Sequence, residues 1–383
     1  MMKPTFVLAP DSFKESMTAK EVCTAMEKGL RHVYPNARYV HVPMADGGEG
    51  TMQSLVDATG GQIIRKSFTG PLGNQVQASF GILGDQPDTA VIEMSSASGI
   101  QLVAPEDRDP QVTTTYGTGE LILACLDHGA KHIIIGLGGS ATNDGGAGMA
   151  QALGVKLLDH EGNELPRGGG ALDQLARIDT SGMDSRLEQL TIEIASDVKN
   201  PLCGRQGASH VFGKQKGGTP EVLKKLDANL AHYAALIKRD AHRNVVAIPG
   251  SGAAGGLGAG LLAFTHASIA AGIDLVINYT RLEKYVAEAD YVFTGEGSID
   301  YQTQFGKTPY GVASVAAKHD KPVIALAGHV GKRIEELYDQ GFTAIFGIVS
   351  GSMGLAEALQ CGPSAVARTS ENIGRLIKKM RTL

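Results

Sequence analysis

Short apolar runs recur along this chain, and a helical pattern follows most of them. The runs occupy residues 5–9, 39–42, 89–94, 132–137, 191–195, 291–294, 323–327 and 344–349. Apolar runs this short predict buried strands. Strands that alternate with helices build largely parallel sheets whose faces the helices cover. The sequence therefore predicts an α/β fold.

Helix-capping signals support this alternation. Thr18 and Glu21 have the spacing of a capping box, which predicts a helix that begins directly after Thr18. Thr219 and Thr308 each stand immediately before a proline. A capping hydroxyl followed by proline favours a helix start, so two further helices are expected at these positions.

The length of the chain and a change of pattern predict two domains. A chain of 383 residues exceeds one ordinary domain. Residues 63–83 alternate around a turn at 70–74, as antiparallel strands do, and we interpret this change as a domain junction. From residue 291 to a long last helix at 355–380, the rhythm of the first part of the chain returns. The two ends are therefore expected to share one domain.

Charge and cysteine content narrow the class of protein. The net charge is −5 and Lys and Arg are scattered, which disfavours nucleic acid as a partner. No window approaches the ~20 continuous apolar residues of a membrane helix, and residues 1–10 lack a signal-peptide core. The cysteines show no C-x-x-C spacing, which favours reduced thiols and a soluble, cytoplasmic protein.

Glycine is over-represented, and one glycine cluster is long. Glycine accounts for 50 of the 383 residues, nearly double the usual ~7%. Residues 136–148 follow an apolar run and precede a helical pattern. Glycines let backbone N–H groups approach an anion, and hydroxyl and amide side chains add donors. The sequence thus predicts phosphate contacts from Gly138, Gly139, Ser140, Thr142, Asn143 and Asp144.

Two loops near the N-terminus carry further charged and polar side chains. Residues 11–16 follow the first apolar run, and Lys14 there can neutralise a phosphate or a carboxylate. Residues 46–51 hold two acids among glycines, which suits Mg²⁺ or substrate hydroxyls. Taken alone, each loop also fits an ordinary solvated turn. The candidate residues are Asp11, Ser12, Lys14, Asp46, Gly47, Gly48 and Glu49.

Three later segments add acids and lysines. Asp197 ends a buried run and suits a base or a metal ligand. Lys216 lies in a glycine- and lysine-rich segment after apolar residues 211–212, which suits a phosphate or a surface charge pair. Residues 294–308 form a loop with far more polar groups than a connection requires. The candidates there are Gly295, Gln302 and Lys307, with Glu296 and Asp300 as metal or base candidates.

One further glycine motif points to a different chemistry. Residues 250–255 match G-x-G-x-x-G after the strand-like residues 245–248, and Asp274 lies at a suitable distance for a ribose contact. That pattern is typical of nicotinamide enzymes, although the glycine-rich residues 256–260 favour a nucleotide-facing or helix-packing role. A complete Walker A loop is absent, because the Gly-Lys-Thr ending at 306–308 lacks the first glycine.

Taken together, these segments resemble the bacterial glycerate kinase family along essentially the whole chain. The matching runs, all in the family's order, are residues 11–14, 46–51, 138–146, 196–202, 252–258 and 294–307. One departure is visible, since Lys214 stands where a proline is expected in the segment that contains Lys216.

The resemblance implies ATP-dependent phosphorylation of D-glycerate with Mg²⁺, at the 2-hydroxyl, to give 2-phosphoglycerate. It also implies a Rossmann-like domain of residues 1–66 plus 288–383 and an inserted mixed α/β domain of residues 67–287, with the active site in the cleft between them. Phosphoryl transfer needs charge placement above all. We therefore expect Lys14 and the loop at residues 138–146 to neutralise phosphates, and Asp197 or Asp300 to act as base or metal ligand.

Other functions remain open at this stage. Attack by the 3-hydroxyl would make the protein a glycerate 3-kinase. A dehydrogenase would use the motif at residues 250–255, and a non-catalytic sugar-acid sensor would keep the pocket without ATP turnover. The expected partners are small molecules, with neither nucleic acid nor membrane, and a homodimer is left open.

Overall fold

The structure is a computed structural model that describes residues 3–381, and its contacts divide the chain into two compact units. The terminal unit comprises the described residues up to Asp46, Gln53–Gly60 and those from Gly272 onward, and the central unit comprises Gly47–Met52 and Gly61–Ala271. The domain boundaries predicted at 66 and 288 stay a prediction, as does the predicted active site between the domains. Residues 1–2 and 382–383, within the first predicted domain, lie outside the described residues.

The terminal unit contains a parallel sheet built from both ends of the chain, as the sequence predicted. Its strand order is β13-β12-β11-β1-β2, and each neighbouring pair is parallel. The strands are β1 (Thr5–Leu8), β2 (Arg38–His41), β11 (Tyr291–Ile299), β12 (Val323–Val330) and β13 (Ala344–Gly347).

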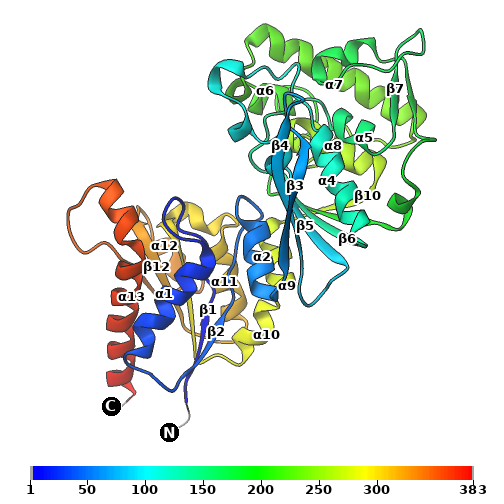
Figure 1. Ribbon diagram of the computed structural model, residues 1–383. Coiled ribbons are helices and arrows are strands. Elements are labelled where there is room, and N and C mark those ends of the chain that lie inside the picture. The colour runs from blue at the N-terminus through cyan, green and yellow to red at the C-terminus, as the bar shows by residue number, and fades with distance from the viewer. Residues whose placement is uncertain (1–2, 382–383) are drawn as a thin grey trace. The chain divides into compact units, whose positions relative to one another are not determined.

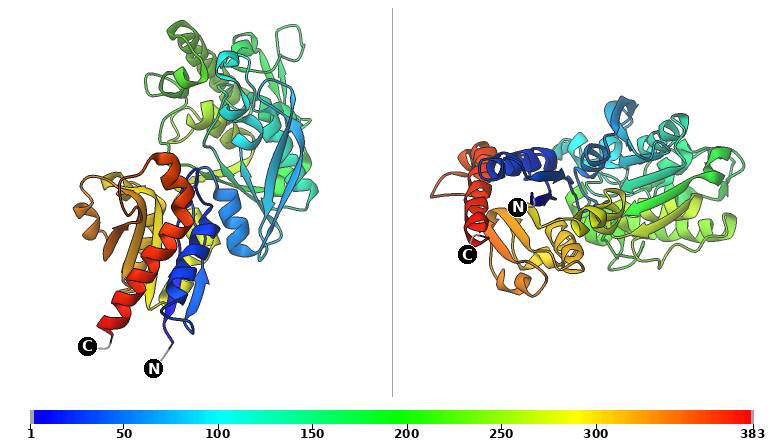
Figure 2. Two further views of the ribbon diagram at one scale, coloured as in Figure 1. Left: turned by 60° about the vertical axis from the view of Figure 1, so that its left-hand side comes forward. Right: turned by 90° about the horizontal axis from the view of Figure 1, so that it is seen from below.

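Helices cover both faces of this sheet (Figures 1 and 2). On one face, α1 and α13 lie side by side although they come from opposite ends of the chain, and their apolar residues pack on Phe6, Leu8 and Phe293. On the other face lie α9, α10 and α11. The helices are α1 (Ala19–Arg31), α9 (Gly272–Tyr279), α10 (Leu282–Ala287), α11 (Thr308–Ala317), α12 (Glu335–Tyr338) and α13 (Leu355–Met380). The first residues of α2 (Thr51–Thr59) belong to the central unit and the rest to the terminal unit.

The central unit contains a mixed six-stranded sheet in the order β10-β9-β6-β5-β4-β3. The first four of these strands are parallel, whereas β3 and β4 form the antiparallel ribbon expected around the turn at residues 70–74 (Figure 1). The strands are β3 (Gln62–Thr69), β4 (Gln75–Ile82), β5 (Thr89–Glu93), β6 (His132–Gly136), β9 (Thr191–Ala195) and β10 (His266–Ala270).

Two apolar cores stabilise the central unit. In the first, isoleucines of β5, β6 and β9 pack against α4 and α8, and in the second, α5, α6, α7 and α8 pack with the small sheet β7–β8. The remaining elements are α3 (Ser95–Ser98), α4 (Tyr116–Asp127), α5 (Ala147–Ala152), β7 (Lys156–Leu158), β8 (Arg177–Asp179), α6 (Ala208–Phe212), α7 (Pro220–Asp240) and α8 (Ala253–Phe264).

Local capping signals predicted two of three helix starts. Thr18 forms the complete capping box of α1, and Thr219 caps α7 with a proline at its start. The prediction at Thr308 is wrong by one residue: Lys307 is the N-cap and Thr308 is already helical. The Thr308 hydroxyl instead donates to Asp11 Oδ2 at 2.5 Å, because a buried carboxylate from a distant part of the sequence offers it a stronger acceptor.

Two other local predictions are corrected by tertiary packing. Residues 245–248 form turns rather than a strand. Glu296 lies within β11 rather than in a loop, because the ladder between β11 and β12 continues to Ile299. The backbone of Glu296 is therefore held by a sheet, whereas Asp300 follows the end of the strand.

Within residues 3–381, none of the helices has both the length and the apolar composition that crossing a membrane requires.

The contact between α1 and α13 depends on Gly29. A Cβ at this position would lie 1.9 Å from the Ala367 backbone oxygen. We expect Gly29→Ala to lower the free energy of unfolding by about 1–3 kcal/mol in urea denaturation, since backbone cannot yield as a side chain can. Gly374→Ala is the matched control in α13, because its Cβ would meet only side-chain atoms at 3.3 Å or more. This control should be neutral or stabilising by up to ~1 kcal/mol, owing to helix propensity. Equal effects of the two substitutions would contradict the packing argument.

Candidate functional site

The glycine-rich loop follows β6 in the central unit and joins it to α5. Gly139, Gly145 and Gly146 have φ angles of 72°, 65° and 78°, in the left-handed region that glycine adopts without strain. Gly138 and Gly139 are exposed, whereas residues 140–148 are buried. The backbone at the beginning of the loop is therefore accessible to a ligand, whereas the rest of the loop is packed inside the protein.

Asp144 organises the buried part of this loop. Its carboxylate accepts hydrogen bonds from Thr115 N at 2.8 Å and Thr115 Oγ1 at 2.9 Å, and from Gly146 N and Gly148 N at 3.1 and 3.2 Å. Burial raises the pKa of Asp144, and these four donors oppose that rise. Because protein donors occupy both carboxylate oxygens, Asp144 is placed to hold the loop.

Lys216 lies under the same loop and is only 2% exposed. Its ammonium donates to Thr142 O at 2.6 Å and to Ser140 Oγ at 3.3 Å. Burial lowers the pKa of Lys216 to about 7, and the nearby Asp144 carboxylate raises it. Lys216 thus supports the loop from inside, at Ser140 and Thr142, two residues that the sequence marked as phosphate ligands.

The motif at residues 250–255 packs directly on this loop. Gly145 N donates to Gly255 O at 3.0 Å, and a Cβ on Gly255 would lie 1.9 Å from Thr142 O. Ala254, Gly255 and Gly256 all have left-handed φ angles. The glycines are therefore needed for close backbone packing, which is one of the two roles expected for them, and the dehydrogenase interpretation has no support here.

Residues 47–52 lie beside the start of the loop. Cβ atoms placed on Gly136 and Gly138 would meet Gly47 O at 3.0 Å and Gly48 Cα at 3.9 Å, respectively. Glu93, at the end of β5, accepts a hydrogen bond from Met52 N at 3.0 Å, and burial raises its pKa. Glu93 is not among the residues predicted from the sequence, although an acid at the end of an apolar strand was a visible signal. The structure thus brings together the segments that contain Gly47, Gly48 and Gly138, with the exposed Glu49 in the same turn.

Asp197 follows β9, the neighbour of β6 in the sheet. Asp197 and Lys199 are both exposed. Because β5, β6 and β9 are adjacent and parallel, the segments after them leave the same edge of the sheet, where α/β proteins bind ligands.

In the terminal unit, Asp11 lies at the corresponding edge. Its backbone N–H donates to Gly295 O at 2.9 Å, and its carboxylate accepts from Thr308 Oγ1 and from Ser12 N. Burial raises the pKa of Asp11 to about 6, Thr308 lowers it and the Asp46 carboxylate raises it. Asp11, Ser12, Asp46 and Gly295 therefore form one cluster.

Glu296 joins this cluster from β11. It accepts hydrogen bonds from Thr303 Oγ1 at 3.0 Å and from Lys307 Nζ at 3.4 Å. Burial raises the pKa of Glu296 to about 7, whereas Lys307 lowers it. Thr303 and Thr308 were not selected from the sequence, because a threonine carries no functional signal until its acceptor is known.

Three predicted residues of the terminal unit are less embedded in this cluster. Lys14 and Gln302 are exposed. Asp300 caps the short 3₁₀ helix at Tyr301–Gln304 and accepts a hydrogen bond from Gln302 N at 2.8 Å. These side chains therefore stand at the rim of the cluster.

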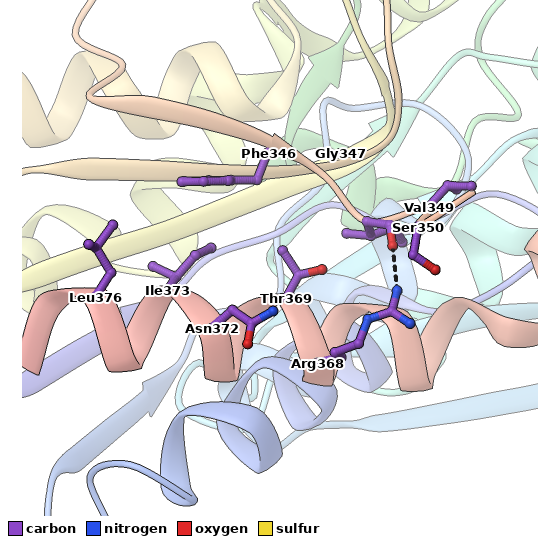
Figure 3. A pocket seen from close by; sticks show the side chains of 10 residues that line it. Phe346, Gly347, Val349, Ser350, Arg368, Thr369, Asn372, Ile373 and Leu376 are labelled. Atoms are coloured by element: carbon purple, nitrogen blue, oxygen red, sulfur yellow. Dashed lines mark hydrogen bonds between the residues drawn. The ribbon is translucent and has the colours of Figure 1, made fainter. Parts of the chain in front are cut away.

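A separate pocket of about 430 Å³ lies between β13 and α13 (Figure 3). Phe346 and Leu376 line one end, and Arg368 at the other end donates to Ile348 O at 3.1 Å. None of the predicted site residues lines this pocket, so the pocket is separate from the strand edges described above.

These edges define a class of protein. Parallel strands end in glycine-rich turns with free backbone, partly buried carboxylates and lysines, and this combination suits an α/β enzyme that transfers a phosphoryl group. The Glycerate kinase family model matches residues 6–378, and the chain belongs to this family.

Relatives of known name support this assignment. The chain is 51% identical to a glycerate kinase of Bacillus subtilis (strain 168), over 98% of each chain. It is 51% identical to the glycerate 2-kinase of Escherichia coli (strain K12), over 96% of each chain. A crystal structure of a candidate glycerate kinase 2 from Salmonella typhimurium LT2 has a TM-score of 0.92 and 49% identity, over 100% of both chains.

The buried Lys216 provides a test of loop support. Lys216→Met should lower both the melting temperature and the activity, because Thr142 O loses its charged donor. The exposed Lys214 is the matched control, and Lys214→Met should leave the melting temperature unchanged.

The pH dependence of unfolding adds an independent readout. Burial lowers the pKa of Lys216 to about 7 in the folded chain from 10.5, so the unfolded chain binds more protons between these values and stability rises with pH there. The unfolding free energy of the wild type minus that of Lys216→Met should therefore increase from pH 7 to pH 10. A difference that stays flat would show that this lysine is not buried as described.

Proposed function

We propose that this protein phosphorylates D-glycerate with ATP at the 2-hydroxyl and forms 2-phosphoglycerate. The observation that carries the proposal is the glycine-rich loop after β6, whose Gly138 and Gly139 leave backbone exposed at the edge of a parallel sheet. The relative from Escherichia coli that is named glycerate 2-kinase supports the choice of hydroxyl.

The proposed roles follow the charges of the two edges. Phosphate oxygens are contacted by the backbone N–H groups of Gly138 and Gly139 and by the exposed ammonium of Lys14. These donors stabilise the negative charge of the phosphoryl group during its transfer. Asp46, Glu49 and Gln302 offer hydrogen-bond partners to the glycerate hydroxyls or carboxylate. Asp197 and Asp300, which the sequence offered as base or metal ligand, are the carboxylates proposed for the metal.

The residues present fit a Mg²⁺ ion that is held mainly by the nucleotide. Among residues 3–381, no three His, Cys, Asp or Glu side chains gather into a metal-binding group. Mg²⁺ in kinases is bound by one or two carboxylates together with substrate phosphates. Asp300 fits this donor set, since its carboxylate is partly exposed. When bound, Mg²⁺ neutralises charge on the phosphates.

An assay of regiochemistry tests the proposal. The protein is supplied with D-glycerate, ATP and Mg²⁺, ADP release is followed, and an enolase step then consumes only 2-phosphoglycerate. We expect signal in both steps. ADP without enolase turnover would move the attack to the 3-hydroxyl, and no ADP would remove the kinase proposal.

Lys14 should act on catalysis and not on stability. Its ammonium is exposed, so Lys14→Met should leave the melting temperature unchanged while kcat/KM for ATP falls by on the order of 10- to 100-fold. Lys28→Met removes an equally exposed lysine from α1 and should retain full activity. A Lys14→Met variant with wild-type kinetics would remove Lys14 from the site.

A further inference from the structure

Glu296 has one carboxylate oxygen that is weakly satisfied within the cluster of the terminal unit. Its Oε1 accepts from Thr303 Oγ1 at 3.0 Å and from Lys307 Nζ at 3.4 Å. Its Oε2 contacts only Lys307 Nζ, at 3.5 Å, which is the limit of hydrogen bonding. The side chain is 13% exposed. Oε2 is therefore weakly satisfied and the side chain keeps some exposure, while the backbone that carries it is fixed in β11.

The neighbouring acids differ from Glu296 in this respect. Asp11 uses both oxygens, since Ser12 N donates to Oδ1 at 2.6 Å and Thr308 Oγ1 donates to Oδ2 at 2.5 Å. Asp300 is the N-cap of a short helix, where its carboxylate accepts from Gln302 N at 2.8 Å and, in a capping box, from the backbone of Thr303. A carboxylate that already accepts strong hydrogen bonds is a poorer proton acceptor. The geometry thus separates Glu296 from the acids around it.

We propose that Glu296, rather than Asp300, accepts the proton of the glycerate hydroxyl during phosphoryl transfer, and that Lys307 positions its carboxylate. This proposal rests on the proposed function. The hydroxyl oxygen forms a bond to the γ-phosphorus of ATP as its proton passes to Glu296 Oε2. The bond between that phosphorus and the β,γ-bridging oxygen breaks, and ADP leaves with the electron pair. The proton then passes from Glu296 to water.

The charges around Glu296 suit a group that exchanges a proton near neutral pH. Lys307 faces it from the start of α11, and Asp11 faces it from the end of β1, with Asp46 acting on Asp11 in turn. From β12, the opposite residue is the uncharged Ala327. Burial raises the pKa of Glu296 to about 7 against the opposing effect of Lys307. A general base works best when its pKa lies near the working pH.

The test is the pH profile of the full-length enzyme with D-glycerate, ATP and Mg²⁺. In the wild type, kcat should fall as the pH drops below about 7, because Glu296 becomes protonated. Glu296→Gln should lower kcat by on the order of 10²- to 10⁴-fold. It should also abolish the fall of kcat at low pH, the acid limb of the profile. Its affinity for D-glycerate, measured by calorimetry with a non-hydrolysable ATP analogue, should change by only a few-fold. Glu283→Gln removes an exposed carboxylate of α10 that pairs with His319, and should behave as the wild type.

A second variant keeps the proposal testable if Glu296→Gln does not fold. Lys307→Met removes the charge that lowers the pKa of Glu296 and should move the acid limb to higher pH by about one unit. A limb that persists unchanged in Glu296→Gln or Lys307→Met, or that disappears in Asp197→Asn or Asp300→Asn instead, would overturn the proposal. A wild type without ADP release contradicts the proposed kinase itself, so the two failures are distinguishable.

Discussion

The buried carboxylate of Asp144 is the interaction on which the central unit depends. A carboxylate without access to water is costly unless its oxygens are satisfied, and here four protein donors from Thr115, Gly146 and Gly148 satisfy them. The same hydrogen bonds close the glycine-rich loop and fix where it turns. Lys216 adds a buried ammonium on the other side of the loop. The exposed glycines at its beginning are therefore presented by a rigid base.

The terminal unit also contains shielded carboxylates, but they are less buried than Asp144. Asp11 and Glu296 lie at neighbouring strand ends, and each is partly shielded from water and paired with a threonine hydroxyl. Burial raises the pKa of Asp11 to about 6 and that of Glu296 to about 7, and a nearby carboxylate adds to each rise: Asp46 for Asp11, and Asp11 for Glu296. Incompletely compensated carboxylates cost stability, and such groups concentrate where chemistry uses them. The central unit thus provides ordered backbone donors, and the terminal unit provides acids that can exchange protons.

Much of the fold could be predicted from the sequence, because its signals are local. The strands at residues 89–93 and 191–195, the capping box at Thr18 and the last helix each follow from neighbouring residues. The family was also visible, since several glycine- and acid-rich runs occur in a fixed order. The errors at Thr308 and in the length of β11 have one cause. Both depend on partners hundreds or tens of residues away, namely Asp11 and β12.

By itself, the sequence determined the α/β class, the family and the set of polar residues from which the site is drawn. Only the tertiary structure decided what each of those residues does. Asp144 and Lys216 look like ligands in the sequence, yet both support the loop from inside. The motif at residues 250–255 looks like a cofactor loop, yet its glycines admit the backbone of another loop. The physical reason is that the identity of a polar side chain or a glycine limits only which contacts are possible. Burial and long-range packing select which of those contacts is made.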